Sequence, residues 1–158
     1  MYVSLRCGSN VTNGKYMENN QDKVNMIKQI LLPAAVLREM REKFKVGRND
    51  LRRALNYERN SDRAKMLRAA ALERGGMIYT GEHAPAGFCP DVETVHDHCK
   101  GIIHQTFGNR VELILERKTN KATVIIDGNR VATFYDMTIK SWGDVLYSLQ
   151  KIYNQLNA

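Results

Sequence analysis

The stretch Lys45-Val46-Gly47-Arg48-Asn49-Asp50-Leu51-Arg52-Arg53-Ala54-Leu55-Asn56 is the most informative part of this chain. Val46, Leu51 and Leu55 fall where a short helix is anchored by neighbouring helices, and its Arg and Asn side chains point outward. Such a helix has one buried edge and one cationic edge. We therefore expect a turn followed by a short basic helix.

The flanking sequence predicts two further helices. Upstream, apolar residues recur every three or four positions at Leu37, Met40 and Phe44. Downstream, Asn60 or Ser61 can cap a helix over residues 62 to about 74, which Gly75-Gly76 ends. Three short helices joined by tight turns are the minimal helix-turn-helix unit.

Residues 46–56 resemble the V-S-x-x-T-V-S-R-x-L-N run of lac-repressor-type and phage-repressor-type DNA-binding domains. The matching residues are Val46, Arg53, Leu55 and Asn56, with Leu51 as a conservative replacement. The following residues, 64–76, are similar to the next helix of that family. The resemblance covers residues 37–76, about a quarter of the chain, and implies a helix-turn-helix DNA-binding domain there.

Three residues depart from the family pattern. Gly47 replaces the Ser or Thr that caps the recognition helix, Lys45 stands where the turn glycine is expected, and Arg41 replaces a small residue at the helix crossing. Asn49 and Asp50 are then alternative caps.

The positive charge of the chain is concentrated on the same segment. Residues 38–74 contain 12 Lys or Arg and 6 Asp or Glu, so they carry +6 of the net charge of +7. Phosphates supply much of the affinity of a DNA-binding module through counterion release, so a local basic surface favours DNA as the partner.

The resemblance also implies roles for individual side chains. A recognition helix contacts base edges with its first residues and with those one turn later, which here are Arg48, Asn49 and Arg53. Contacts to phosphates are then assigned to Lys43, Lys45, Arg52 and Arg59.

The C-terminal half shows a different pattern. Residues 77–89 are broken by Gly and Pro and are expected to be a linker. From Pro90, apolar spacing predicts a helix to about Phe107. Residues 111–116 then alternate as a strand, and residues 122–126 and 130–135 are expected to be two further strands joined by an Asp127-Gly128 turn. Ser141 is expected to cap a final apolar helix.

The predicted fold class is therefore α+β. A helix-turn-helix domain of three or four helices, residues 22–76, is followed by a small α-β-β-β-α domain, residues 90–158, with a three-stranded antiparallel sheet. Two helices are expected to cover one sheet face. A fourth helix is predicted over residues 24–32, before Pro33.

The N-terminal residues 1–21 are polar and rich in Asn and Gly, so we expect them to be disordered. Whether residues 1–16 belong to the natural protein is open, because Met17 reads as an alternative start. No signal peptide or membrane span is predicted.

The cysteines and histidines give no established motif. The three cysteines, Cys7, Cys89 and Cys99, show no disulfide framework, which favours free thiols in the cytoplasm. The least unfavourable metal ligands are His83, Cys89, His96 and Cys99, but their spacing matches no known site, so no metal and no cofactor are expected.

The sequence thus predicts a cytoplasmic, non-enzymatic regulator that binds specific sequences of double-stranded DNA as a homodimer, through a C-terminal dimerisation or sensing domain. The arrangement loosely resembles short accessory proteins of bacterial mobile elements and prophages. Two alternatives stay open. The helices could dock an acidic protein partner, or the His/Cys cluster could serve a metal-dependent enzyme.

Overall fold

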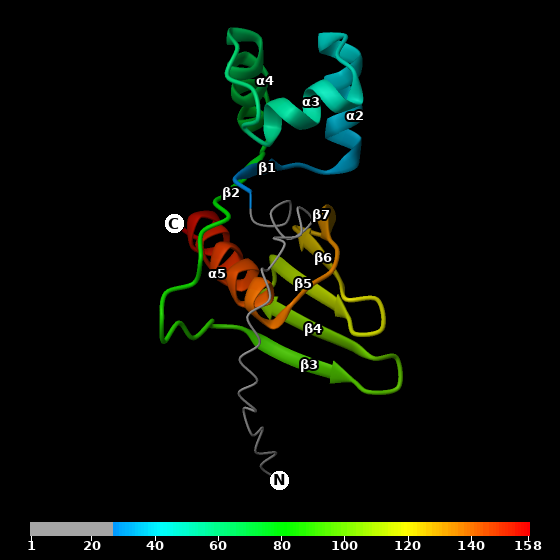
Figure 1. The fold of residues 1–158 in the computed structure, drawn as a ribbon, viewed down its shortest axis with the longest axis vertical. Helices are drawn as coiled ribbons and strands as arrows, with labels where there is room; N and C mark the ends of the chain where they lie inside the picture. The colour runs from blue at the N-terminus through cyan, green and yellow to red at the C-terminus, as the bar shows by residue number, and fades with distance from the viewer. Residues whose placement is uncertain (1–26) are drawn as a thin grey trace, which may run out of the picture.

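The computed structural model describes residues 27–158, in which three helices stand above a five-stranded antiparallel sheet covered by one long helix (Figure 1). A two-stranded ribbon joins the two parts. The segment predicted to be disordered, residues 1–21, and the start of the helix predicted over residues 24–32 lie outside the described residues.

Helices occur at three of the predicted places: α2 (Ala34–Phe44), α3 (Arg48–Leu55) and α4 (Asp62–Glu73). They share a hydrophobic core to which α2 contributes Met40 and α3 contributes Leu51, both almost fully buried. We refer to α2, α3 and α4 as the helical head.

At the α2–α3 turn, the two residues that depart from the family pattern, Lys45 and Gly47, adopt the backbone conformations that the turn requires. Lys45 has φ 49° and ψ 50°, the left-handed conformation that the absent glycine would adopt without strain. Gly47 precedes α3 in an extended conformation, and no side chain caps this helix. Ser61 caps α4 by accepting a hydrogen bond from the Ala64 N–H, at 3.2 Å.

The ribbon consists of β1 (Gln29–Leu31) and β2 (Met77–Tyr79), paired antiparallel. The prediction of a helix over residues 24–32 is therefore wrong in its described part. Side chains alternate along a strand, and here Ile30 and Leu32 enter the core of the helical head whereas Leu31 enters the core of the sheet. These three consecutive side chains point alternately into two cores on opposite sides of the chain. A strand can bury all of them in this way, whereas a helix could not.

The sheet is a meander of β3 (Glu93–Asp97), β4 (Ile102–Phe107), β5 (Val111–Glu116), β6 (Lys121–Ile126) and β7 (Asn129–Phe134), in that order. The chain is α+β, but the architecture predicted with that class is wrong, because the described residues form five strands in this sheet rather than three. The helix predicted from Pro90 to Phe107 is instead the β3–β4 hairpin. Ile103, Gln105 and Phe107 are buried with a period of two, which only a strand provides.

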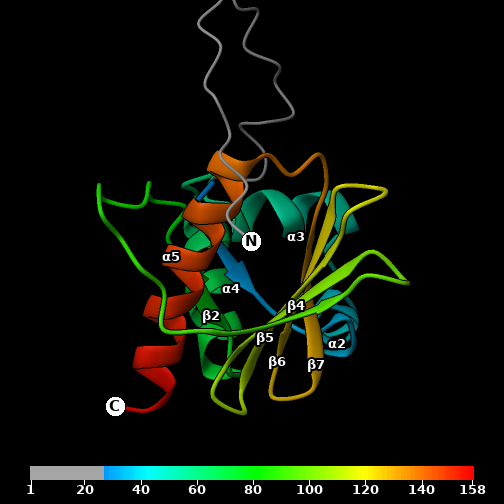
Figure 2. The same ribbon diagram turned by 90° about the horizontal axis from the view of Figure 1, so that it is seen from below.

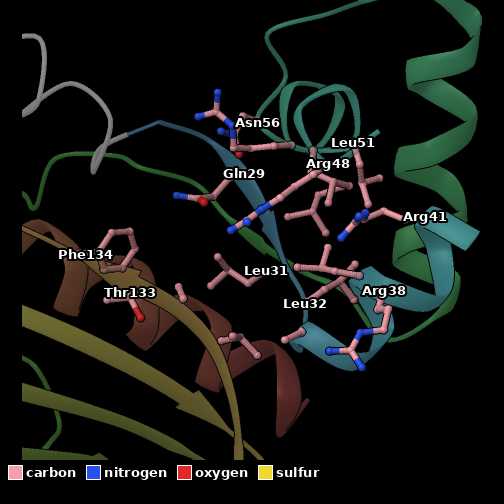
Figure 3. A pocket seen from close by; sticks show the side chains of 17 residues that line it. Gln29, Leu31, Leu32, Arg38, Arg41, Arg48, Leu51, Asn56, Thr133 and Phe134 are labelled. Atoms are coloured by element: carbon pink, nitrogen blue, oxygen red, sulfur yellow. The ribbon is translucent and has the colours of Figure 1, made fainter. Parts of the chain in front are cut away.

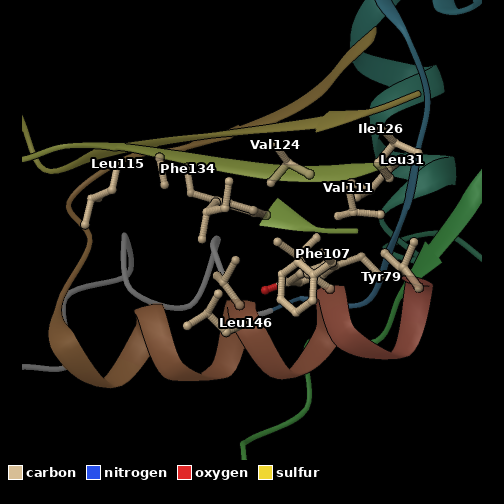
Figure 4. Close-up of a cluster of buried hydrophobic side chains, with 14 of the residues drawn as sticks. Leu31, Tyr79, Phe107, Val111, Leu115, Val124, Ile126, Phe134 and Leu146 are labelled. Carbon is tan, nitrogen blue, oxygen red and sulfur yellow. The ribbon is translucent and has the colours of Figure 1, made fainter. Parts of the chain in front are cut away.

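One helix, α5 (Ile139–Leu156), covers one face of the sheet, where two were predicted (Figures 2 and 4). Thr138 caps it, and the predicted cap, Ser141, occupies the third helical position of a capping box. Its apolar stripe packs on the strands through Val145, Leu146, Leu149 and Ile152, all buried. Among residues 27–158, no helix is long and apolar enough to cross a membrane.

The segment predicted as a linker, residues 77–89, is fixed to the rest of the molecule. It begins with β2 and continues along α5, where the buried carboxylate of Asp144 accepts a hydrogen bond from the Ala84 N–H at 2.7 Å and contacts His83 Nδ1 at 3.0 Å. Tyr79, at the end of β2, lies in the sheet core beside Phe134, with ring centroids 5.4 Å apart. Burial raises the pKa of its hydroxyl to about 12.

Candidate nucleic-acid interface

Helix α3 lies between α2 and α4 at the front of the helical head (Figure 1). Leu51, Ala54 and Leu55 are buried against the neighbouring helices. The remaining five residues of the helix are exposed and polar: Arg48, Asn49, Asp50, Arg52 and Arg53. Because each residue turns the helix by about 100°, these polar residues occupy one continuous side of α3.

Of the three residues predicted to contact bases, two lie on the solvent-facing part of the polar side of α3 and one lies on the part nearest the sheet. Asn49 and Arg53, one turn apart, lie opposite the buried edge and face solvent. The Nε atom of Arg53 is 3.9 Å from Glu58, an exposed pair that contributes little and leaves the guanidinium accessible. Arg48 lies on the flank of α3 nearest the sheet, where it lines a cavity.

The four residues predicted to contact phosphates are also exposed. Lys43 and Lys45 stand at the α2–α3 turn, and Arg52 lies one turn after Arg48. Arg59 differs, because its Nη1 atom is 3.2 Å from the carboxylate of Asp50. Asp50, expected as an alternative cap, therefore pairs with Arg59, and the first N–H groups of α3 have no side-chain cap.

One cation of the basic segment is internal. Arg68 on α4 is buried and donates hydrogen bonds to the carbonyl oxygens of Ala54 (3.0 Å) and Arg59 (2.8 Å) and to Asn60 Oδ1 (3.2 Å). Its guanidinium also lies 4.7 Å from the centre of the Tyr57 ring. Arg68 therefore holds the end of α3 to α4 and does not belong to the exposed cationic surface.

A cavity of about 490 Å³ separates the helical head from the sheet (Figure 3). We call it the head–sheet cavity. Its lining includes residues of α2, α3, β1 and β7, among them the four arginines Arg38, Arg41, Arg48 and Arg52. This site was not predicted from the sequence, because Arg38 and Arg41 belong to no recognised ligand-binding motif and nothing in the sequence places β7 beside α3.

The weak metal candidates do not form a common site. His83 contacts Asp144 in the segment along α5, and Cys89 and Cys99 are exposed free thiols. The ring of His96 stacks on His98, with centroids 5.9 Å apart, at the exposed end of the β3–β4 hairpin. Within the part of the chain that the structure describes, no three His, Cys, Asp or Glu residues are grouped so as to hold a metal ion.

No family model, curated protein or solved structure matches this chain. Function is therefore inferred from the chemistry and placement of its own residues.

Proposed function

We propose that the protein is a regulator that binds specific sequences of double-stranded DNA, with α3 in the major groove. The observation that carries the proposal is the exposed polar side of α3, where four side chains suited to DNA, Arg48, Asn49, Arg52 and Arg53, lie beside one another on a helix anchored by Leu51 and Leu55. The resemblance of residues 37–76 to lac-repressor-type and phage-repressor-type domains supports it.

These side chains and their neighbours can contact both the bases and the phosphates of DNA. Asn49 can pair with adenine and Arg53 with guanine, each such pair giving about 1–3 kcal/mol of discrimination. Lys43, Lys45 and Arg52 flank them and supply charge for phosphates. The uncapped N–H groups at the start of α3 add donors that favour a phosphate. No catalytic residue or cofactor enters this proposal.

Binding as a homodimer follows from the size of the helical head. One three-helix unit buries little surface on DNA, and two half-sites one helical turn apart provide the rest of the affinity. The apolar stripe of α5 is used inside its own part of the molecule. The other candidate surface is the sheet face opposite α5, where half-buried Ile102, Ile114 and Ile125 alternate with core residues. We propose this face as the dimer contact.

A cytoplasmic location fits a DNA partner and the free thiols of Cys89 and Cys99.

The salt dependence of binding to a mixed-sequence 20-base-pair duplex tests the phosphate contacts. We expect the variant Lys43→Gln/Lys45→Gln to reduce the slope of log K against log salt by about 2, since each lost phosphate contact changes it by about 0.9. Fluorescence anisotropy at four or more salt concentrations measures the slope.

The matched control is Lys118→Gln/Lys140→Gln, which removes the same charge from exposed positions on the sheet side of the molecule. This control should keep the slope of the wild type. If both double variants change the slope equally, the protein binds DNA through net charge alone and the helical head is not the interface.

A further inference from the structure

All the charged side chains that line the head–sheet cavity are positive. Arg38 and Arg41 of α2 and Arg48 and Arg52 of α3 line it, and none of its described lining residues is Asp or Glu. Among residues 27–158, none of these four guanidinium groups has an ion pair or a side-chain hydrogen bond. By contrast, Arg53, Arg59 and Arg74 of the same head each lie within 4 Å of a carboxylate. The cavity therefore gathers four arginines that have no counter-charge among the described residues.

Apart from Gln29, Asn56 and Thr133, the rest of the lining is apolar. Ile30, Leu32, Leu51 and Leu55 are buried residues that also contribute to its lining. Figure 3 shows Leu31 of β1 and the following residue, Leu32, at its centre, with Arg48 extending from α3 toward β1. A ligand that fits this surface needs an apolar body and a negatively charged end.

The opposite wall is the edge of a strand that pairs with no further strand on that side among residues 27–158. Four consecutive residues of β7, 131–134, line the cavity, although neighbouring side chains on a strand point to opposite faces. The cavity must therefore reach the edge of β7, which is the outermost strand of the sheet. The register of β7 on β6 shifts between Val124 and Ile125, so Val131 is left out of the pairing. Unpaired backbone groups at such an edge can hydrogen bond a ligand.

We propose that the head–sheet cavity is a binding site for a small amphipathic organic anion, whose carboxylate, sulfonate or phosphate is held by the arginines of α2 and α3. A volume of about 490 Å³ is in the range typical of small-molecule sites. Arginine pairs with such oxyanions through two parallel hydrogen bonds, and four arginines offer several such arrangements. Binding of this ligand does not require that α3 bind DNA.

A pair of fluorescent probes tests the site. 1-Anilinonaphthalene-8-sulfonate has an apolar body with a sulfonate, and N-phenyl-1-naphthylamine has nearly the same body without charge. We expect the wild type to bind the sulfonate about tenfold more tightly than the neutral probe, because hydrogen bonds to a charged group are worth more than neutral contacts. Fluorescence titration of the full chain measures both constants.

Two variants assign the binding to the cavity. Arg38→Gln/Arg41→Gln, which spares every residue proposed to contact DNA, should weaken the sulfonate about tenfold and leave the neutral probe unchanged. Ala34→Trp, at an exposed lining residue, should obstruct the cavity and weaken both probes. Lys118→Gln/Lys140→Gln should change neither. Equal unfolding midpoints for all proteins establish that the variants fold.

Three results would overturn the proposal: equal affinity of the wild type for the two probes, an unchanged sulfonate constant in Arg38→Gln/Arg41→Gln, or unchanged binding of both probes in Ala34→Trp. None of these results bears on DNA binding by α3, which the salt-dependence experiment tests separately.

Discussion

Replacing Arg68 with Ala is expected to lower the free energy of unfolding by about 3 kcal/mol. The substitution removes the donor to the carbonyl oxygen of Arg59 and one of the two donors to that of Ala54, which keeps a hydrogen bond from the Tyr57 N–H. These carbonyl groups lie where α3 ends and the chain turns toward α4. Each buried polar group left without a partner costs about 1–3 kcal/mol. The loss of the contact with the Tyr57 ring adds to this cost. Urea unfolding followed by circular dichroism measures the change.

Arg63→Ala is the matched control. Arg63 is also an arginine of α4, but it is exposed and makes one hydrogen bond, to the carbonyl oxygen of Phe44 at 3.2 Å. Its replacement should cost less than about 1 kcal/mol. A cost for Arg68→Ala no larger than that of Arg63→Ala would mean that Arg68 does not join α3 to α4.

The second large effect is expected in the sheet. Phe107→Ala should cost about 3–5 kcal/mol, because Phe107 is fully buried between the sheet and α5, with its ring centroid 6.2 Å from that of Tyr153. Val95→Ala should cost less than about 0.5 kcal/mol, because Val95 is 57% exposed on β3. Chemical denaturation of the two variants and the wild type provides the comparison.

This pair of variants also distinguishes the β3–β4 hairpin from the helix expected over the same residues. On that helix, Val95 lies on the apolar side and is buried, so its truncation would be costly. Similar large losses for Val95→Ala and Phe107→Ala would contradict the strands.

The strands β3 and β4 could not be predicted because their apolar residues fit two periods. Val92, Val95, Cys99 and Ile102 recur at three and four, as on a helix, yet Val95 and Cys99 are exposed. The burial of Ile103 and Phe107 decides the structure, and that burial depends on α5, which lies over 30 residues away in the sequence. The turn at residues 98–101, where Gly101 has φ 67°, is a local signal that favoured the hairpin.

Predictions succeeded where the signal was local. Strand β5 alternates strictly between buried and half-buried residues, and the Asp127-Gly128 turn joins β6 and β7 as expected. Ser61 caps α4 through its own side chain. The ribbon of β1 and β2 and the head–sheet cavity could not be foreseen, because both depend on residues more than 40 positions apart in the sequence.

The most direct test of DNA recognition by α3 is selection from a random-sequence duplex pool, followed by sequencing, with the wild type and with Asn49→Ala/Arg53→Ala. We expect the wild type to enrich a palindromic site with half-sites about one helical turn apart, and the variant to lose the preference at particular base pairs of each half-site. A wild-type pool that stays unsorted, or a variant that enriches the same site as strongly, would contradict the proposal that α3 reads DNA sequence.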